Sequence, residues 1–579
     1  MKPRCESSAG CAGSDGSVTQ SRDRSFFARL RRQAAIRLRG GWWLLRNRGP
    51  SQFQFWLIAL LLGSAAGYAA VLFRKGIALL EGLVYQTDNV ARLHSQAEYL
   101  PWFWVLLVPV AGGLVVGVLL HHFTPEGRVR SVADVIEGAA LHEGRVERRA
   151  GLASAAASLI TLGTGGSSGR EGPVVHLAAV ISGWVSDRIR ADGITGRDLL
   201  GCAVAAAVSA SFNAPIAGAL FALEVVLRHF AIHAFAPIVI ASVAGTVISR
   251  LHFGDVTEFA LPATSVLAFY VELPAFLILG LVCGLVATVM MMAVFVAEDV
   301  AGHVQMRLRL PGWLRPAAAG LMLGALAIWF PHIIGVGYET TSAALTGRLV
   351  WHEALVFAAL KVLAVAITLG GRMGGGVFSP SLMVGALTGL TFGLLATAVL
   401  PDYSGAATLY ALAGMGAVAG AVLGAPISTT LIVFELTGDW QTGLAVMVAV
   451  STSVALSARL VRRSFFLTQL RRRGIRLAAG PQAYLLGMFT VSRLMRPTDH
   501  PRAAPPDACR DLIEDGLYVE PGATLETAMP IFERAGVPFL PVVTRGGKDG
   551  PDLVGALFHV DALKAYNRAL AAVSKEEHG

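Results

Sequence analysis

The sequence has little charge for its length. Of its 579 residues, 15% are Asp, Glu, Lys or Arg, whereas 54% are apolar, and the mean hydropathy is +0.59. This balance is typical of an integral membrane protein rather than of a large soluble enzyme. The length therefore does not predict a series of soluble domains.

The residue patterns of enzymes and metal sites are also scarce. The five cysteines have no metal-ligand spacing. The glycine-rich turns lack the Gly-Lys-Ser/Thr ending of a nucleotide-binding loop, and the apolar region has no nucleophile–base pair. We therefore predict that the protein is not an enzyme and that it has no catalytic residue, no metal and no cofactor.

Apolar runs of membrane-spanning length do occur. With a rise of 1.5 Å per residue, a helix needs about 20 residues to cross a bilayer. Three further apolar segments are too short or too glycine-rich to do so alone, and we expect broken, re-entrant or tilted helices there. The long runs are 55–72, 102–120, 276–296, 313–330 and 442–458, and the short ones are 173–189, 215–226 and 426–436.

The formal net charge of +9 is concentrated at the two ends of the apolar region, in arginines before residue 50 and after residue 461. The positive-inside bias places both termini in the cytoplasm, and we expect a multi-pass protein of the bacterial inner (plasma) membrane. Basic flanks of this kind favour contact with anionic lipid over a nucleic acid. We expect no signal peptide.

Composition divides the chain into four regions. Within the membrane unit, two related halves cover roughly residues 51–250 and 270–460. In the first region, residues 26–45 fit either an amphipathic helix or a disordered basic arm. The regions are a basic tail (1–50), the membrane unit (51–478), a linker (479–510) and a C-terminal segment of soluble character (511–579).

The C-terminal segment has the pattern of a small α/β domain. Strands are expected at 517–519, 539–543 and 553–557, and helices at 524–535 and 559–571. This order resembles one cystathionine-β-synthase-type (CBS) motif. Such motifs normally occur in pairs, so we interpret the segment as a single or degenerate CBS-like domain. Of the residues that hold ribose in nucleotide-binding members, Asp561 alone remains, and we do not expect a bound nucleotide.

A glycine-rich turn occurs twice, about two hundred residues apart. The copies span residues 161–173 and 368–380, with Thr-Leu-Gly, a later Gly and a closing Pro at the same offsets. A second repeated pattern places Glu224 after Ala-Pro-Ile in the first half and Glu435 after Ala-Pro-Ile in the second. In a membrane protein, corresponding breaks in two halves point to an ion or substrate site near the midplane.

The chemistry of these turns favours an anion. A glycine-rich loop that runs into a helix presents unpaired backbone N–H groups at the positive end of the helix dipole. Glycine has no Cβ, so an anion can approach the backbone closely. Two such loops facing each other would bind a small anion without any fixed positive charge.

Glu171 lies inside the first turn. An ionisable side chain at membrane depth is costly and is a functional candidate by default. A carboxylate beside an anion-binding helix terminus can occupy the anion's own place when ionised and leave it when protonated or displaced. An ion pair with Arg170, or a loop at the water interface, is the alternative interpretation.

Three runs carry a family resemblance. They resemble signature motifs of the CLC family of chloride channels and chloride/proton exchangers, and the resemblance covers about residues 50–480, with the CBS-like segment also fitting. It implies an all-α polytopic membrane protein with two inverted-topology repeats of broken and tilted helices, assembled as a homodimer with one anion pathway per subunit. The runs are Gly169-Arg170-Glu171-Gly172-Pro173, Gly376-Val377-Phe378-Ser379-Pro380 and Asn213-Ala214-Pro215-Ile216-Ala217-Gly218.

The resemblance also implies roles for single residues. Glu171 is the gate. The backbone N–H groups of Val377 and Phe378 line the central anion site, and those of the turn that contains Gly169, Arg170 and Gly172 line the outer one.

Three positions depart from the family pattern. In the family's first motif only Ser131, whose hydroxyl would bind the central anion, matches; the flanking glycines and proline are absent. Val225 stands where exchangers usually carry the inner proton acceptor, and Phe466 stands where a tyrosine usually donates a hydroxyl to the central anion. We therefore expect weaker anion binding at the central site.

The valine at the acceptor position favours the channel branch. We predict passive, voltage- and pH-dependent conduction of chloride and similar small anions, gated by Glu171. Two alternatives stay open. One is a chloride/proton antiporter with an atypical inner proton route, for which Glu224 is the nearest group; its match Glu435 favours a structural role for both. The other is a secondary transporter of other small anions.

Overall fold

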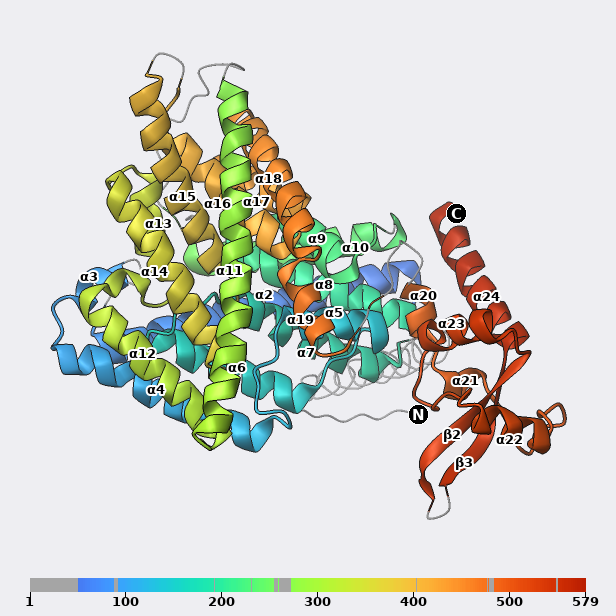
Figure 1. The fold of residues 1–579 in the computed structure, drawn as a ribbon. Coiled ribbons are helices and arrows are strands. Elements are labelled where there is room, and N and C mark those ends of the chain that lie inside the picture. Colours follow the sequence, from blue (N-terminus) through green and yellow to red (C-terminus); the bar gives the residue numbers. More distant parts are fainter. Residues whose placement is uncertain are drawn as a thin grey trace, which may run out of the picture.

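A computed structural model describes residues 50–87, 92–191, 193–230, 232–254, 259, 272–401, 404–475, 477, 484–547 and 550–578. The predicted basic tail, with its candidate helix at 26–45, lies outside the described residues. The described chain forms a large helical unit and a small C-terminal unit, drawn in red in Figure 1.

The first half of the helical unit ends in a short helix, Pro215–Phe221, and a longer one, Ile232–Phe253. The short helix continues directly into a π-helix at Ala222–Leu227. The half comprises α2 (Gln52–Tyr85), α3 (Leu93–Ala97), α4 (Trp102–Phe123), α5 (Val132–Leu141), α6 (Arg148–Gly163), α7 (Glu171–Ile189), α8 (Gly193–Phe212), α9 (Pro215–Phe221) and α10 (Ile232–Phe253).

The second half repeats this order, so α14 to α18 correspond to α6 to α10. One further helix, α19, follows. The half comprises α11 (Leu273–Arg307), α12 (Arg315–Trp329), α13 (Tyr338–Leu345), α14 (Trp351–Gly370), α15 (Phe378–Val399), α16 (Ala407–Leu423), α17 (Pro426–Thr437), α18 (Trp440–Val461) and α19 (Phe465–Arg472), with 3-10 turns at Gly312–Leu314 and Pro331–Ile333.

Seven described helices are long and apolar enough to cross a membrane. Four of them, α2, α4, α11 and α18, contain spans predicted from sequence, and the predicted span 313–330 instead forms the 15-residue α12 after a 3-10 turn. The sequence analysis missed α10, α14 and α15. In α14, the charged residue Lys361 interrupts the apolar run. Its side chain is fully buried and donates to the carbonyls of Ile333 (3.2 Å) and Gly335 (2.9 Å).

The corresponding helices α8 and α16 form the centre of the helical unit. Nearly every residue of each is buried, which is typical of a helix with apolar or small residues on all sides. Small residues let neighbours approach closely: a Cβ on Gly385 of α15 would lie 2.3 Å from the carbonyl oxygen of Gly414 of α16. The centre is therefore packed through glycine and alanine, and α7 and α15 are fixed against it.

The C-terminal unit contains an antiparallel three-stranded sheet of order β1-β3-β2. Arg493, at its start, forms an ion pair with Glu143, just beyond the end of α5, so this unit lies against one end of the helical unit. Its elements are α20 (Tyr484–Met488), α21 (Val491–Leu494), β1 (Arg496–Pro497), α22 (Pro506–Glu514), α23 (Leu525–Ala535), β2 (Phe539–Gly547), β3 (Gly550–Phe558) and α24 (His559–His578).

Two details of this unit differ from the prediction. The stretch 479–510 was predicted to be a linker, but β1 pairs with β3 and Val491 is buried in the same apolar core as Leu525 and Leu557. Its prolines suggested an unstructured connection, although they lie between short ordered elements. The strand predicted at 517–519 is reduced to a single parallel bridge between Val519 and Val542.

Candidate functional site

The two glycine-rich turns meet. Gly169 donates its backbone N–H to the carbonyl of Gly376, and Gly376 donates to the carbonyl of Gly169, both at 2.7 Å. A Cβ on Gly376 would lie 3.1 Å from the backbone nitrogen of Gly172. Glycine is required at this contact because a larger residue would separate the two backbones. The starts of α7 and α15 are thereby held side by side.

The carboxylate of Glu171 lies across this junction. Glu171 is 3% exposed, and its Oε1 accepts a hydrogen bond from the hydroxyl of Ser379 in the first turn of α15. Its Oε2 is buried and has no hydrogen-bond partner among the described residues. The carboxylate of the first half therefore sits at the positive N-terminus of a helix of the second half, where a small anion would be stabilised.

Arg170 points elsewhere. Its Nε lies 4.0 Å from Glu171 Oε1, which is the outer limit of an ion pair. Its guanidinium donates to the carbonyl of Ser211 at 3.2 Å and lies over the ring of Tyr338. Arg170 and the carboxylate thus form a long ion pair, and a direct hydrogen bond to the carboxylate comes from Ser379.

A cavity of about 90 Å³ leads away from Glu171. By the same measure a water molecule needs about 10–15 Å³, so the cavity has room for a small hydrated anion. Gly169, Arg170 and Val225 are not among its described lining residues. The cavity brings together six residues predicted from sequence: Ser131, Glu171, Gly172, Val377, Phe378 and Phe466.

The aromatic part of the cavity wall contains no hydroxyl donor. Phe466 is 4% exposed and lines the cavity beside Phe465, whose ring stacks on Phe295 with 5.1 Å between centroids. Phe378 also lines the cavity and packs against Phe212. The wall at Phe466 is therefore apolar where a tyrosine hydroxyl would donate.

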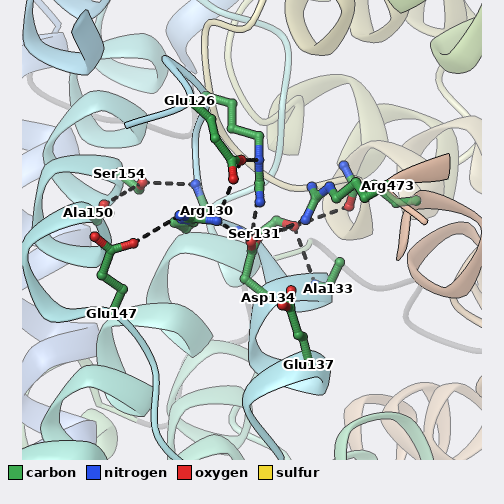
Figure 2. Close-up of polar contacts among 12 residues, drawn as sticks. Glu126, Arg130, Ser131, Ala133, Asp134, Glu137, Glu147, Ala150, Ser154 and Arg473 are labelled. Atoms are coloured by element: carbon green, nitrogen blue, oxygen red, sulfur yellow. Dashed lines mark hydrogen bonds and ion pairs between the residues drawn. The ribbon is translucent and has the colours of Figure 1, made fainter. Parts of the chain in front are cut away.

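Ser131 caps α5, and its hydroxyl is already engaged. The hydroxyl lies 3.2 Å from Gln469 Oε1 and 3.4 Å from Asp134 Oδ2, and its oxygen accepts the backbone N–H of Ala133 (Figure 2). The Ser131 backbone N–H donates to Asp134 Oδ2 at 2.7 Å. This capping box replaces the glycine- and proline-containing turn of the family motif.

Asp134 is the centre of a charge cluster (Figure 2). Its Oδ1 accepts from Arg128 (2.9 Å), Arg130 (3.1 Å) and Arg473 (3.1 Å). Burial alone would raise the pKa of Asp134, but Arg473, Arg128 and the backbone N–H of Ser131 outweigh it and lower the pKa to about 2. The carboxylate is therefore ionised throughout the physiological range.

Glu224 and Glu435 cap each other's half of the protein. The carboxylate of Glu224 accepts the backbone N–H groups of Ile427 (3.0 Å) and Ser428 (2.8 Å), as well as the Ser428 hydroxyl, at the start of α17. The carboxylate of Glu435 accepts the backbone N–H groups at the start of α9. Both glutamates thus satisfy helix N-termini that would otherwise be unpaired.

Val225 lies in the π-helix next to Glu224. It is 5% exposed and belongs to the apolar core of the helical unit. A π-helix adds one residue to a helical turn and changes the direction of the side chains that follow. No sequence signal predicted it.

Several residues of the site were missed by the sequence analysis. Ser379 could have been noticed, since it is the hydroxyl residue of the second turn at the position of Gly172 in the first. Gln469, Arg128 and Arg473 carry no motif, and Gln469 and Arg473 reach the site only through the fold, 338 and 339 residues from their partners Ser131 and Asp134.

In the C-terminal unit, Asp561 is occupied by a protein contact. Its Oδ2 accepts from Arg496 Nε (2.8 Å) and Nη2 (2.7 Å), and the same guanidinium lies over the Phe558 ring. The carboxylate that could hold a ribose is therefore paired within the unit.

Two helical halves joined by glycine turns, with a buried carboxylate at opposed helix N-termini, define a multi-pass membrane transport protein built from repeats. Residues 112–458 match the family model described as voltage gated chloride channel. The chain belongs to the CLC family of chloride channels and antiporters.

Relatives match over most of the chain. A ClcB-like protein of Ralstonia nicotianae is 33% identical over 399 residues, covering 68% of this chain and 91% of the relative. The voltage-gated ClC-type chloride channel ClcB of Escherichia coli is 31% identical over 425 residues, covering 72% and 98%.

Solved structures share the fold. A slow cyanobacterial Cl⁻/H⁺ antiporter has a TM-score of 0.64 at 19% identity, covering 73% of this chain and 98% of that structure. A eukaryotic CLC transporter has a TM-score of 0.63 at 19% identity, covering 90% and 98%. The predicted fold class is confirmed.

Proposed function

We propose that the protein conducts chloride passively across the membrane and that Glu171 is its gate. The observation that carries the proposal is the position of the Glu171 carboxylate, buried at the N-terminus of α15 and hydrogen-bonded to Ser379. There it occupies the place that favours an anion. Protonation or displacement of the side chain empties this place, so conduction rises as external pH falls and responds to voltage.

In this proposal the backbone N–H groups of Val377 and Phe378 bind the central anion. In the first turn, the N–H groups of Arg170 and Gly172 bind the outer one, whereas the N–H of Gly169 is donated to the carbonyl of Gly376. The central site is weak, because the Ser131 hydroxyl is engaged by Asp134 and Gln469 and because Phe466 offers no donor. Weak binding suits passive conduction, in which the ion must leave as readily as it enters.

The passive mode is supported at the inner proton-acceptor position. Val225 cannot carry a proton, and it is buried in the apolar core. Glu224 accepts three hydrogen bonds at the start of α17, which favours a structural role. Neither residue lines the cavity that leads to Glu171.

The second candidate is chloride/proton antiport with an atypical inner proton route. It is supported by the structural likeness to a cyanobacterial protein described as a Cl⁻/H⁺ antiporter. In that case another group, or water in the cavity, would deliver the proton to Glu171. Transport of other small anions is a third, weaker candidate.

We also propose a homodimer. The glutamate caps lie at the surface of the helical unit, where Ile216 (55% exposed) and Ile427 (46% exposed) present apolar side chains next to half-buried carboxylates. A carboxylate facing lipid is costly, so a second copy covering this face would be stabilising. A single CBS-like unit could pair with that of the other subunit. Both termini are proposed to be cytoplasmic, in a bacterial inner membrane, with no cofactor and no nucleic-acid partner.

The test is chloride efflux from liposomes. The purified protein is reconstituted with high internal KCl. Efflux starts when valinomycin is added, because K⁺ can then leave with chloride and no opposing membrane potential builds up. We expect chloride efflux above that of empty liposomes and faster efflux at low external pH. Efflux no faster than from protein-free liposomes at any pH would contradict the proposed function.

A further inference from the structure

A second cavity, of about 310 Å³, lies between α5, the loop that follows α5, and α7. No described residue lines both this cavity and the one at Glu171. At about 10–15 Å³ for a water molecule, it has room for several. Its wall includes His142 (60% exposed) and Glu147 (48% exposed), so it opens to solvent. Glu143, next to His142, pairs with Arg493, so the opening lies on the side of the C-terminal unit.

A buried histidine is part of the wall of this second cavity. His176 of α7 is 2% exposed, and neither its Nδ1 nor its Nε2 has a hydrogen-bond partner among the described residues. Gly151 of α6 leaves room for the ring, because a Cβ there would lie 2.8 Å from Nε2. A buried imidazole without a partner is costly. Water in the cavity is the partner left for these nitrogens, and water can also deliver a proton to them.

Charged groups from α5 and from the segment before it act on His176. Burial disfavours a charged ring, Asp134 favours it, and Arg130 and Arg128 disfavour it. From α6 the neighbour is Gly151, which has no charge. The other charged or titratable residues of the wall are bound to protein partners: Glu137 to His142, Arg145 to Glu143 and Asp187, and Glu147 to Arg130.

Asp134 connects His176 with the chloride cavity. Its Oδ2 accepts the backbone N–H of Ser131 at 2.7 Å, and Ser131 lines the cavity that leads to Glu171. A proton on His176 adds a positive charge beside Asp134, so the potential at the Ser131 end of that cavity becomes more favourable to an anion. His176 and Glu171 belong to one helix, but five residues correspond to about 1.4 turns, so the two side chains leave α7 in different directions.

We propose that His176 is a proton-binding site, separate from Glu171 and supplied through the second cavity, and that its protonation strengthens chloride binding. The inference rests on the proposed function and adds a second titratable group to it. Glu171 responds to external pH, whereas His176 receives protons from the side of the C-terminal unit. Since coupling between two sites is reciprocal, chloride binding also promotes proton binding at His176.

The test starts from Glu171→Gln, because this change removes the titratable gate. Asp134 titrates at about pH 2, below the range used. Calorimetric titration with sodium chloride at constant ionic strength, between about pH 4.5 and 7.5, brackets the usual histidine value of about 6.5. We expect the chloride dissociation constant to fall about threefold to tenfold toward acidic pH. Repetition in buffers of different ionisation enthalpy measures the proton uptake that accompanies chloride binding, which should be above zero where the constant changes.

Two double variants assign the proton. In Glu171→Gln/His176→Gln, the pH dependence and the proton uptake should both disappear. Glu171→Gln/His142→Gln is the control and should retain both, because His142 is the exposed histidine of the same cavity.

A chloride affinity of Glu171→Gln that does not change with pH would overturn the proposal, and this result requires no change at His176. A pH dependence that persists without His176, or that disappears without His142, would overturn it too, since the proton would then belong to another group. Failure of the proposed function has a different signature, absence of chloride efflux from the parent.

Discussion

Ser379 donates its hydroxyl to the carboxylate of Glu171 from the opposite half of the protein, 208 residues along the chain. The two residues occupy neighbouring positions in the two copies of the same turn. The first copy thus supplies the negative group, and the second supplies the hydroxyl and the helix terminus that receive it. The site is asymmetric although the backbone around it is repeated.

Glu171→Gln should raise chloride flux and flatten its dependence on external pH. A neutral amide resembles the protonated carboxyl group and no longer competes for the positive terminus of α15. Flux is measured in liposomes between about pH 4.5 and 7.5, a range that begins near the usual pKa of a glutamate. A pH profile in the variant that matches the parent would contradict the gating role and favour pairing with Arg170.

Ser379→Ala should favour the open gate without removing the charge. The carboxylate loses its hydroxyl donor, and a hydrogen bond to a charged group contributes about 1.5–3 kcal/mol. We expect higher flux at neutral pH but retained pH dependence. Thr388→Val is the matched control, since the Thr388 hydroxyl donates to the carbonyl of Val384 in its own helix. Equal effects in both variants would assign the change to the packing of α15.

Phe466→Tyr should tighten chloride binding, because the new hydroxyl would reach into the cavity that Phe466 lines. The gain is at most about 1.5–3 kcal/mol, the contribution of a hydrogen bond to a charged group. Calorimetric titration with chloride compares it with Phe434→Tyr, since Phe434 packs against Trp440 and is not among the cavity-lining residues. No gain at position 466 would mean that the anion does not pass this ring.

Chloride should not drive proton movement. With a threefold chloride gradient across liposomes, we expect the membrane to settle at the chloride equilibrium potential whatever the pH difference, since Val225 is not titratable. Proton uptake is followed with an internal pH dye. Uphill uptake that disappears in Glu171→Gln would establish the antiporter. Its further loss in Glu224→Gln, in a variant that stays folded, would identify the inner acceptor.

Asp134 should make stability depend on acidic pH. Its pKa in the folded protein, about 2, lies below the usual value of about 3.9, so the stabilisation is complete above about pH 4 and is lost as pH falls through 2. The stabilisation is about 2 kcal/mol. Thermal unfolding in detergent between about pH 6 and 3 should show a fall in stability that Asp134→Asn reduces. An equal fall in the variant and the parent would contradict this prediction.

The sequence predicted the parts of the site that depend on local backbone chemistry. The glycines of the two turns and the position of Glu171 follow from what a close contact and a helix terminus require. Ser379, Gln469 and Arg473 could not be assigned, because their roles depend on which helices of the other half lie opposite. The same holds for Asp134. Two of its arginine partners lie in the segment just before α5, and the third follows directly after α19.

Element boundaries failed where composition and environment disagree. Lys361 lowers the hydropathy of α14, yet buried carbonyls receive its ammonium group. The prolines of 497–506 suggested a linker, yet the stretch carries β1 and the start of α22. In both cases, contacts with residues distant in the sequence stabilise an element that composition alone argued against.

The exchanged caps of Glu224 and Glu435 bear on how the protein is made. The N–H groups at the start of α9 are paired with the carboxylate of Glu435, which is synthesised 219 residues later. Those at the start of α17 are paired with Glu224, which is synthesised 203 residues earlier. During insertion, the first half therefore reaches the bilayer with an unfinished helix start. These N–H groups are paired only when the second half packs against the first. Folding of the first half therefore depends on a residue that is synthesised later.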